Sequence, residues 1–287
     1  MNSFQILTDS CCDLPAELVR QLDVTVVPLS VEMEGRSYAD GIDMSPKELY
    51  DHLRAGKTAR TSAVNPEFWA SHMDPLLAAG QDLLVIAFSS GLSTTYQSAV
   101  IAAGEMAEKY PARRIRVVDS LCASLGQGLL VWYACRHRAQ GEDLDTVYQW
   151  VLDNRLHLCH WFTVDDLMHL KRGGRVSAAT AVMGTMLQIK PVLHVDDEGH
   201  LISVSKTRGR KASLNALADR MVQTCLPGEN DTIFISHGDC LEDAEYVGNL
   251  LKERCGVKNV IINYVGAVIG SHTGPGVVAL FFLGQQR

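Results

Sequence analysis

The fold is decided by residues 82–98, DLLVIAFSSGLSTTYQS. The first seven residues form a short apolar run that is typical of a buried strand, and the residues after Ser98 have the apolar spacing of an amphipathic helix. A strand that passes through hydroxyl side chains and one glycine into a helix is a building unit of layered α/β proteins. We predict that free N–H groups at this helix start, with the neighbouring hydroxyls, bind a carboxylate or a phosphate.

The same order of strand, polar turn and helix recurs through the first half of the chain. The predicted strands cover residues 4–9, 24–30, 83–88 and 115–119. Ser45-Pro46-Lys47-Glu48 combines an N-cap, a proline at the first helical position and a capping-box glutamate, and Asn65-Pro66-Glu67 repeats the device. We therefore predict an α/β fold whose N-terminal part is a mostly parallel sheet with flanking helices.

The pattern changes between residues 140 and 160, where a helix ends and a new strand-like run begins at Leu158. We predict a domain boundary there, with an N-terminal α/β domain over 1–158 and a C-terminal α/β domain over 159–287. In the second domain we expect a small-residue, methionine-containing helix over 177–187, a hairpin that turns at 196–199, strands at 232–236, 260–264 and 277–283, a helix over 241–255, and a glycine-rich loop over 266–276.

Composition excludes several classes of function. The 287 residues are 47% apolar and carry a formal charge of −7, which argues against a protein that coats nucleic acid. No apolar run approaches the roughly 20 residues that span a bilayer, and the first residues do not form a signal peptide. We expect a cytoplasmic protein that makes at most a transient contact with a membrane surface.

Cofactor and metal motifs are also missing from the sequence. The eight cysteines contain no C-x-x-C pair, and most lie in apolar runs, as expected for buried thiols in a reducing compartment. There is no H-E-x-x-H motif and no glycine-rich ATP loop of the G-x-x-x-x-G-K-[ST] type. We predict no bound metal and no cofactor.

Three hydroxyl-rich turns follow the predicted strands, namely Thr8-Asp9-Ser10, Ser89 to Thr95, and Asp119-Ser120. Ligands in open parallel sheets bind beyond the carboxyl ends of the strands, so these turns are expected to converge on one site. For any single turn, helix capping is the favoured explanation. Their convergence favours a binding site.

Two basic clusters stand out on this acidic chain. They comprise Lys171, Arg172 and Arg175, and Lys206, Arg208, Arg210 and Lys211. Each is either a solvated face at the end of a helix or a docking surface for phosphate or an acidic partner.

Ser93 is a weak candidate nucleophile, because the sequence around it lacks the second glycine of the G-x-S-x-G elbow. A hydrolase or transferase acting on a small carboxylate or phosphate ester, with Ser93 and His272 as working groups and Asp119 as orienter, is nevertheless an alternative that the sequence leaves open. His272 lies among Ser271, Thr273 and Gly274, where apolar packing partners are missing, so it is equally a candidate anion donor.

Taken together, motifs spread from residue 8 to residue 276 resemble the DegV family. The matching motifs are Thr8-Asp9-Ser10 with Asp13-Leu14-Pro15, Thr61-Ser62, Ser89-Ser90-Gly91-Leu92-Ser93, Val118-Asp119-Ser120, Lys171 with Gly173-Gly174-Arg175, Lys190-Pro191, Lys206 with Arg208, and His272 with Gly274-Pro275-Gly276. Each motif is weak alone, but together and in this order they are specific.

The resemblance implies a two-domain protein that holds one long-chain fatty acid between its domains, like the lipid-carrying subunit of bacterial fatty acid kinase. The tail would lie in an apolar tunnel. Thr61, Ser93 and His272 would hold the carboxylate, with Ser62 and Thr94 beside them. A separate ATP-dependent fatty acid kinase would then form an acyl phosphate for phospholipid metabolism.

The resemblance also implies that Arg175 and Arg208 contact the kinase and that the chain itself is not an enzyme. Two positions depart from the family pattern. Thr94 stands where glycine is common, and Cys11 and Cys12 replace small or hydroxyl residues after Thr-Asp-Ser. Besides the carrier and the enzyme, a regulatory interaction module remains a third hypothesis.

Overall fold

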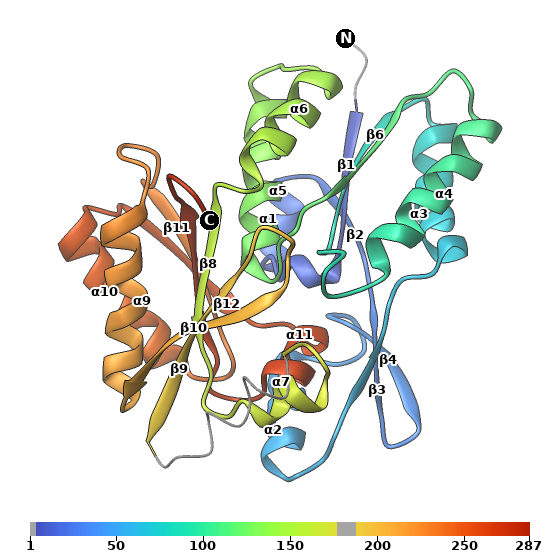
Figure 1. Ribbon diagram of the computed structural model, residues 1–287. Coiled ribbons are helices and arrows are strands. Elements are labelled where there is room, and N and C mark those ends of the chain that lie inside the picture. Colours follow the sequence, from blue (N-terminus) through green and yellow to red (C-terminus); the bar gives the residue numbers. More distant parts are fainter. Residues whose placement is uncertain (1–3, 177–187) are drawn as a thin grey trace.

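The computed structural model describes residues 4–176 and 188–287. Its first half is built on a parallel four-stranded sheet (Figure 1). In order across the sheet the strands are β2 (Val24–Val27), β1 (Phe4–Asp9), β6 (Asp82–Ala87) and β7 (Ile115–Asp119). The parallel sheet predicted for this half is therefore confirmed.

The two faces of this sheet are covered by different helices. Side chains alternate along each strand, so that Ile6 packs toward α5 (Leu125–Ala139) and Leu7 packs toward α3 (Pro66–Ala78) and α4 (Thr95–Lys109). The other elements of this half are the short 3-10 helix η1 (Ser10–Cys12), α1 (Ala16–Gln21), α2 (Pro46–Arg54) and α6 (Leu144–Asn154). The expected capping box at Ser45 and the Asn65 cap are both formed.

A small antiparallel sheet lies beside the first one and carries one of the candidate residues. Its strands are β4 (Arg36–Ala39), β3 (Ser30–Met33) and β5 (Arg60–Ser62). The sequence predicted a single strand over 24–30, and this prediction is wrong. Pro28 has no N–H to donate, so pairing stops there and the chain passes from β2 to β3 in another sheet.

The second half is built on a six-stranded mixed sheet. In order its strands are β10 (Leu201–Arg208), β9 (Ile189–Val195), β8 (Leu158–Thr163), β13 (Val278–Leu283), β11 (Thr232–His237) and β12 (Asn259–Tyr264). Only the β11–β12 pair is parallel. Its helices are α7 (Met168–Arg172), α9 (Arg210–Thr224), α10 (Leu241–Cys255) and α11 (Ala267–Thr273).

Helix α5 joins the two halves, because it packs between the two large sheets (Figure 1). Its Leu129 and Leu130 belong to one continuous core that includes Ile86 of the first sheet and Phe234 and Phe281 of the second. The outer face of the second sheet is covered by α9 and α10 (Figure 1). The last strand of the first large sheet ends at residue 119, and the first strand of the second begins at residue 158. The division into two domains at residue 158 stays a prediction.

Two further expectations concern the C-terminal half. The loop predicted over 266–276 contains α11, whose first N–H, on Ala267, donates to the buried Asp40 Oδ1 at 3.0 Å. Because this cap comes from a residue far away in the sequence, residues 266–276 alone show their glycines and no sign of a helix start. The small-residue helix predicted over 177–187 lies outside the described residues. Within 4–176 and 188–287 no helix has the length and apolar character that crossing a bilayer requires.

Candidate functional site

A cavity of about 440 Å³ lies between the two large sheets. Most of its wall is apolar, and the apolar lining comes from both halves of the chain: Leu29, Ala63, Phe88, Leu92, Ala123, Phe162, Leu170, Val195, Leu201, Val265, Val268, Ile269, Val277, Ala279 and Phe281. An apolar cavity of this size that opens between two layers is suited to a small, mainly apolar ligand.

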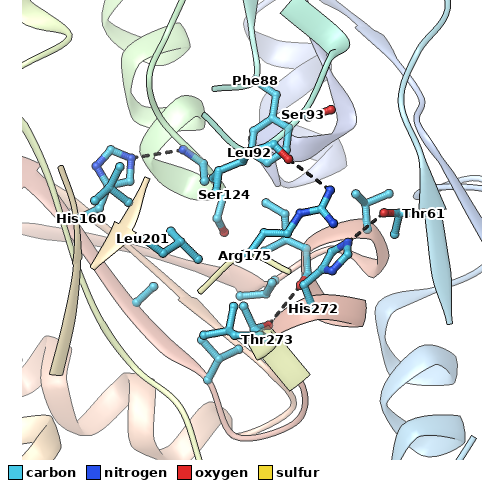
Figure 2. Close-up of a pocket in the computed structure, with 18 of the residues that line it drawn as sticks. Thr61, Phe88, Leu92, Ser93, Ser124, His160, Arg175, Leu201, His272 and Thr273 are labelled. Carbon is cyan, nitrogen blue, oxygen red and sulfur yellow. Dashed lines mark hydrogen bonds between the residues drawn. The ribbon is translucent and has the colours of Figure 1, made fainter. Parts of the chain in front are cut away.

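Polar side chains gather at one part of this wall, where three elements meet. Thr61 on β5 and His272 on α11 lie within hydrogen-bond distance, with 2.8 Å between Thr61 Oγ1 and His272 Nε2. Arg175, which follows α7, is half-buried and donates from Nη2 to the Leu92 carbonyl at 3.2 Å. Figure 2 shows its guanidinium between that carbonyl and the Thr61–His272 pair.

His272 packs tightly against the turn after α7. A Cβ at Gly173 would lie only 2.2 Å from His272 Nδ1, so the close approach of ring and backbone requires glycine at 173. Burial, and secondarily the charge of Arg175, lower the pKa of His272 from 6.5 to about 4. The imidazole is therefore neutral at pH 7, and its ring nitrogens act as one donor and one acceptor.

The lowered pKa makes the stability of the protein sensitive to acid. The unfolded chain takes up a proton on His272 near pH 6.5 and the folded protein only near pH 4, so stability falls as the pH drops through that range. Through this histidine, the unfolding free energy of the wild type should fall by about 3 kcal/mol between pH 7 and pH 4. We expect His272→Gln to lack this part of the fall. Urea denaturation of the ligand-free proteins measures it, with the exposed His200→Gln as control. Parallel stability curves for wild type and His272→Gln would contradict it.

The loop between β6 and α4 is less open to an anion than the sequence suggested. The N–H of Ser90 donates to Asp119 Oδ1, that of Gly91 to Ser89 Oγ, and those of Leu92 and Ser93 to the Ser89 carbonyl. These N–H groups of the loop are occupied within the protein, and at the helix start the Thr95 N–H donates to Ser93 Oγ. That the first turn of α4 binds an anion stays a prediction.

The three hydroxyl-rich turns adjoin one another at the ends of their strands, but only the turn from Ser89 to Thr95 contributes described lining residues to the cavity. Asp9 accepts from the N–H of Cys11 and, at 2.7 Å, from that of Phe88, while Asp119 accepts from Ser90 and Leu121. Burial raises the pKa of the Asp9 carboxyl to about 7. The aspartates thus hold the turns together, and both Cys11 and Cys12 are buried in the core beneath them.

The geometry does not assemble Ser93, His272 and Asp119 into a hydrolytic triad. Ser93 Oγ lies 2.9 Å from Thr95 Oγ1 and accepts the Thr95 N–H, whereas His272 Nε2 is paired with Thr61. A serine nucleophile needs a base within hydrogen-bond reach. The structure therefore gives the enzyme hypothesis no base beside Ser93.

The structure brings together most of the residues singled out from the sequence. Thr61, Ser62, Ser93, Thr94, Arg175 and His272 all line the cavity. Thr61 and Ser62 lie on β5, a strand of three residues, which is too short to give a recognisable strand pattern in the sequence. Thr94 has a φ of −80°, so threonine fits there without strain. Arg208 is exposed at the end of β10 and is not a lining residue.

Sequence reasoning missed other polar lining residues. His160, on β8, accepts the Ala123 N–H at 3.3 Å. The Ser124 hydroxyl donates to the buried Asp13, and its Oγ lies 2.9 Å from Ser236 Oγ. They stand singly within strands and turns, and only the packing of the two sheets brings them to one wall. Among residues 4–176 and 188–287 no group of three His, Cys, Asp or Glu side chains is placed to hold a metal ion.

Comparisons with known proteins agree with this architecture. The family model described as "Uncharacterised protein, DegV family" matches residues 3–285. A DegV domain-containing protein of Clostridium perfringens is 44% identical, with 100% of this chain and 99% of that protein covered.

Solved structures are similar over the same length. A DegV family protein of Thermus thermophilus, described as binding fatty acid, superposes with a TM-score of 0.87 at 31% identity over 98% of this chain and 99% of that one. A stearic acid-binding protein of Eubacterium ventriosum superposes with a TM-score of 0.88 at 25% identity over 98% of each chain.

Proposed function

The chain belongs to the DegV family, and from this premise we propose that it binds one long-chain fatty acid in the cavity between its two sheets. The observation that carries the proposal is an apolar cavity with the Thr61–His272 pair and Arg175 gathered on one part of its wall. Structural relatives that are described as binding fatty acid support it. Each buried methylene contributes roughly 0.8 kcal/mol to binding of the tail.

The carboxylate is assigned to the polar part of the wall, because a buried charge is costly unless several donors satisfy it. With a proton on Nε2, neutral His272 donates to Thr61 Oγ1 and leaves the threonine hydroxyl free to donate to the carboxylate. Ser93 offers a second hydroxyl, and Ser62 and Thr94 lie next to these two donors. Arg175 supplies the only positive charge among the described lining residues.

We further propose that the protein presents this fatty acid to a separate ATP-dependent kinase in the cytoplasm and is not itself a catalyst. In that reaction a carboxylate oxygen forms a bond to the γ-phosphorus of ATP as the bond from that phosphorus to ADP breaks. The products are an acyl phosphate and ADP. The proposal suits a chain whose sequence contains no glycine-rich ATP loop.

The contact with the kinase is assigned to Arg175 and Arg208, as the family resemblance implies. Arg208 is exposed and available to a partner, whereas Arg175 is half-buried and lines the cavity. Arg175 therefore takes a second role, which the sequence did not indicate, as the cation nearest to the proposed carboxylate. The division into domains 1–158 and 159–287, with the ligand between them, belongs to the same proposal.

Removing one hydroxyl donor should weaken binding while the fold is kept. We expect Thr61→Val and Ser93→Ala each to lower the affinity for oleate about 10-fold, because each removes one hydrogen bond to a charged group. Delipidated protein is titrated with oleate and followed by calorimetry, and native mass spectrometry of the untreated protein identifies the co-purified lipid. The exposed Ser71→Ala is the matched control.

Two results would contradict the proposal. Wild-type protein that neither co-purifies with nor binds a fatty acid would exclude the carrier, and turnover of a small ester by the protein alone would favour the enzyme. Unchanged affinity in both variants would refute the carboxylate assignment while leaving the cavity as the site of the tail.

A further inference from the structure

One polar side chain lies on the floor of the cavity among apolar neighbours. Ser236 is on the inner face of β11, where it pairs with Ala279 of β13, and Ala279 pairs in turn with Phe162 of β8. All three side chains line the cavity, and Ser236 is fully buried. A hydroxyl group therefore stands in a row of side chains that crosses the second sheet beneath the cavity.

This serine lies in the part of the cavity that is assigned to the tail of a ligand. Ser236 Oγ is 2.9 Å from Ser124 Oγ. Figure 2 shows Ser124 across the cavity from the Thr61–His272 pair. A fatty acid whose carboxylate is held by that pair therefore reaches Ser236 with its chain and not with its head group.

Ser236 keeps a free hydrogen-bond acceptor. The single hydroxyl proton of Ser124 is donated to Asp13, so this proton is not available to Ser236. No other side chain or backbone N–H of the described residues donates to Ser236 Oγ. The lone pairs of this oxygen are therefore open to a donor on a bound ligand.

The histidine on the same side of the cavity does not compete for such a donor. Both ring nitrogens of His160 are paired, because Nδ1 donates to the Leu158 carbonyl at 3.0 Å and Nε2 accepts the Ala123 N–H. Figure 2 shows this ring on the side of Ser124. A ligand group that carries a proton to this side of the cavity therefore finds its acceptor at Ser236.

A plain hydrocarbon tail makes poor use of this wall. Methylenes that cover Ser236 exclude water and leave its lone pairs without a donor, which costs binding free energy. A hydroxyl group on the tail supplies the missing proton and is itself kept paired. A serine that only made room for the tail would, when replaced with alanine, leave the preference between plain and hydroxylated tails unchanged.

We propose that the cavity selects fatty acids that carry a hydroxyl group on the far half of the tail, with this hydroxyl donating to Ser236 Oγ. The inference rests on the proposed function and deepens it, because it names the class of fatty acid that fits this chain. A site built to hydrogen-bond a hydroxyl of its ligand disfavours the analogue that lacks it. The carboxylate keeps the donors already assigned to it, so the selection is made at the floor of the cavity.

The test compares stearate with stearates hydroxylated on carbon 12, 14 or 16, each titrated calorimetrically into delipidated protein. The wild type should bind at least one of these isomers as tightly as stearate or more tightly. For that isomer we expect the affinity relative to stearate to fall about 10-fold in Ser236→Ala, because one hydrogen bond is lost. The affinity for stearate itself should stay the same or rise, which also shows that the variant is folded.

Three controls accompany this variant. The isomer hydroxylated on carbon 2, next to the carboxylate, should lose nothing relative to stearate. Ser236→Cys, whose sulfur is only a weak acceptor, is a second variant that should lose affinity in the same direction. Thr163→Val removes a buried hydroxyl without a described partner from the opposite face of the same sheet, and should change none of the affinity ratios.

The outcomes separate this inference from the proposed function. Unchanged ratios in both Ser236 variants, or weaker binding of all three isomers than of stearate by the wild type, would overturn the hydroxyl site, while stearate binding would still support the carrier. An equal loss for every ligand, the carbon-2 isomer included, would likewise overturn the site. A wild type that binds neither stearate nor any hydroxystearate would overturn the carrier itself.

Discussion

Replacing Ala279 with phenylalanine is expected to lower the affinity for an 18-carbon fatty acid about 100-fold. Ala279 lies on β13, is 7% exposed and lines the cavity between the sheets. A benzyl group there occupies the space of about four methylenes of the tail, and each lost methylene weakens binding by roughly 0.8 kcal/mol. Titration of the delipidated variant with stearate gives the affinity.

The length of the ligand provides the internal control. A 12-carbon acid leaves part of the cavity empty, so we expect its affinity to fall less than fivefold in Ala279→Phe. Retained binding of the short acid also shows that the variant is folded. Ala107→Phe, on the exposed side of α4, should leave both affinities unchanged. Equal losses for the two acids would show that the tail does not reach β13.

Gly173→Ala is expected to lower the free energy of unfolding by about 2 kcal/mol and the affinity for oleate at least 10-fold. The backbone at Gly173 has a φ of −72°, which alanine adopts freely, so the effect comes from contact alone. The new Cβ would lie 2.2 Å from His272 Nδ1, and the ring must move away from Thr61 to relieve the overlap. Urea denaturation and oleate titration measure the two effects.

Gly104→Ala is the matched control for this substitution. Gly104 lies within α4 and a Cβ there meets no atom within 4 Å, so we expect it to raise the unfolding free energy by up to about 1 kcal/mol through helix propensity. Its affinity for oleate should not change. If Gly173→Ala behaves like Gly104→Ala, the packing of His272 against the turn is not what positions the ring.

The parallel half of the fold is readable from the sequence because its signals are local. The apolar run at 83–88 and the caps at Ser45 and Asn65 act over a few residues, and the structure forms each of them. The helix 267–273 was hidden because its cap, Asp40, comes from a distant segment. Helix α5 was also not singled out, since it is apolar toward both sheets and lacks the one-sided pattern of a surface helix.

For the candidate site, too, local signals were readable from the sequence and contacts between distant segments were not. Thr61, Ser93 and His272 were found through the motifs of a family, and all three line the cavity. The loop around Ser93 looked open to an anion because the sequence does not show that Asp119 and Ser89 occupy its N–H groups. Arg172 was visible as part of a basic cluster, but only the fold shows that it lines a cavity together with Arg60.

Neither half of the chain encloses the central hollow by itself, because its walls come from both large sheets and from the segments around α5. A molecule bound there meets its full set of contacts only in the folded state, so occupancy opposes unfolding by about 2.7 kcal/mol when the free ligand is at 100 times its Kd. The ligand-free protein is therefore expected to unfold at a lower temperature, and to be digested by proteases sooner, than the occupied protein.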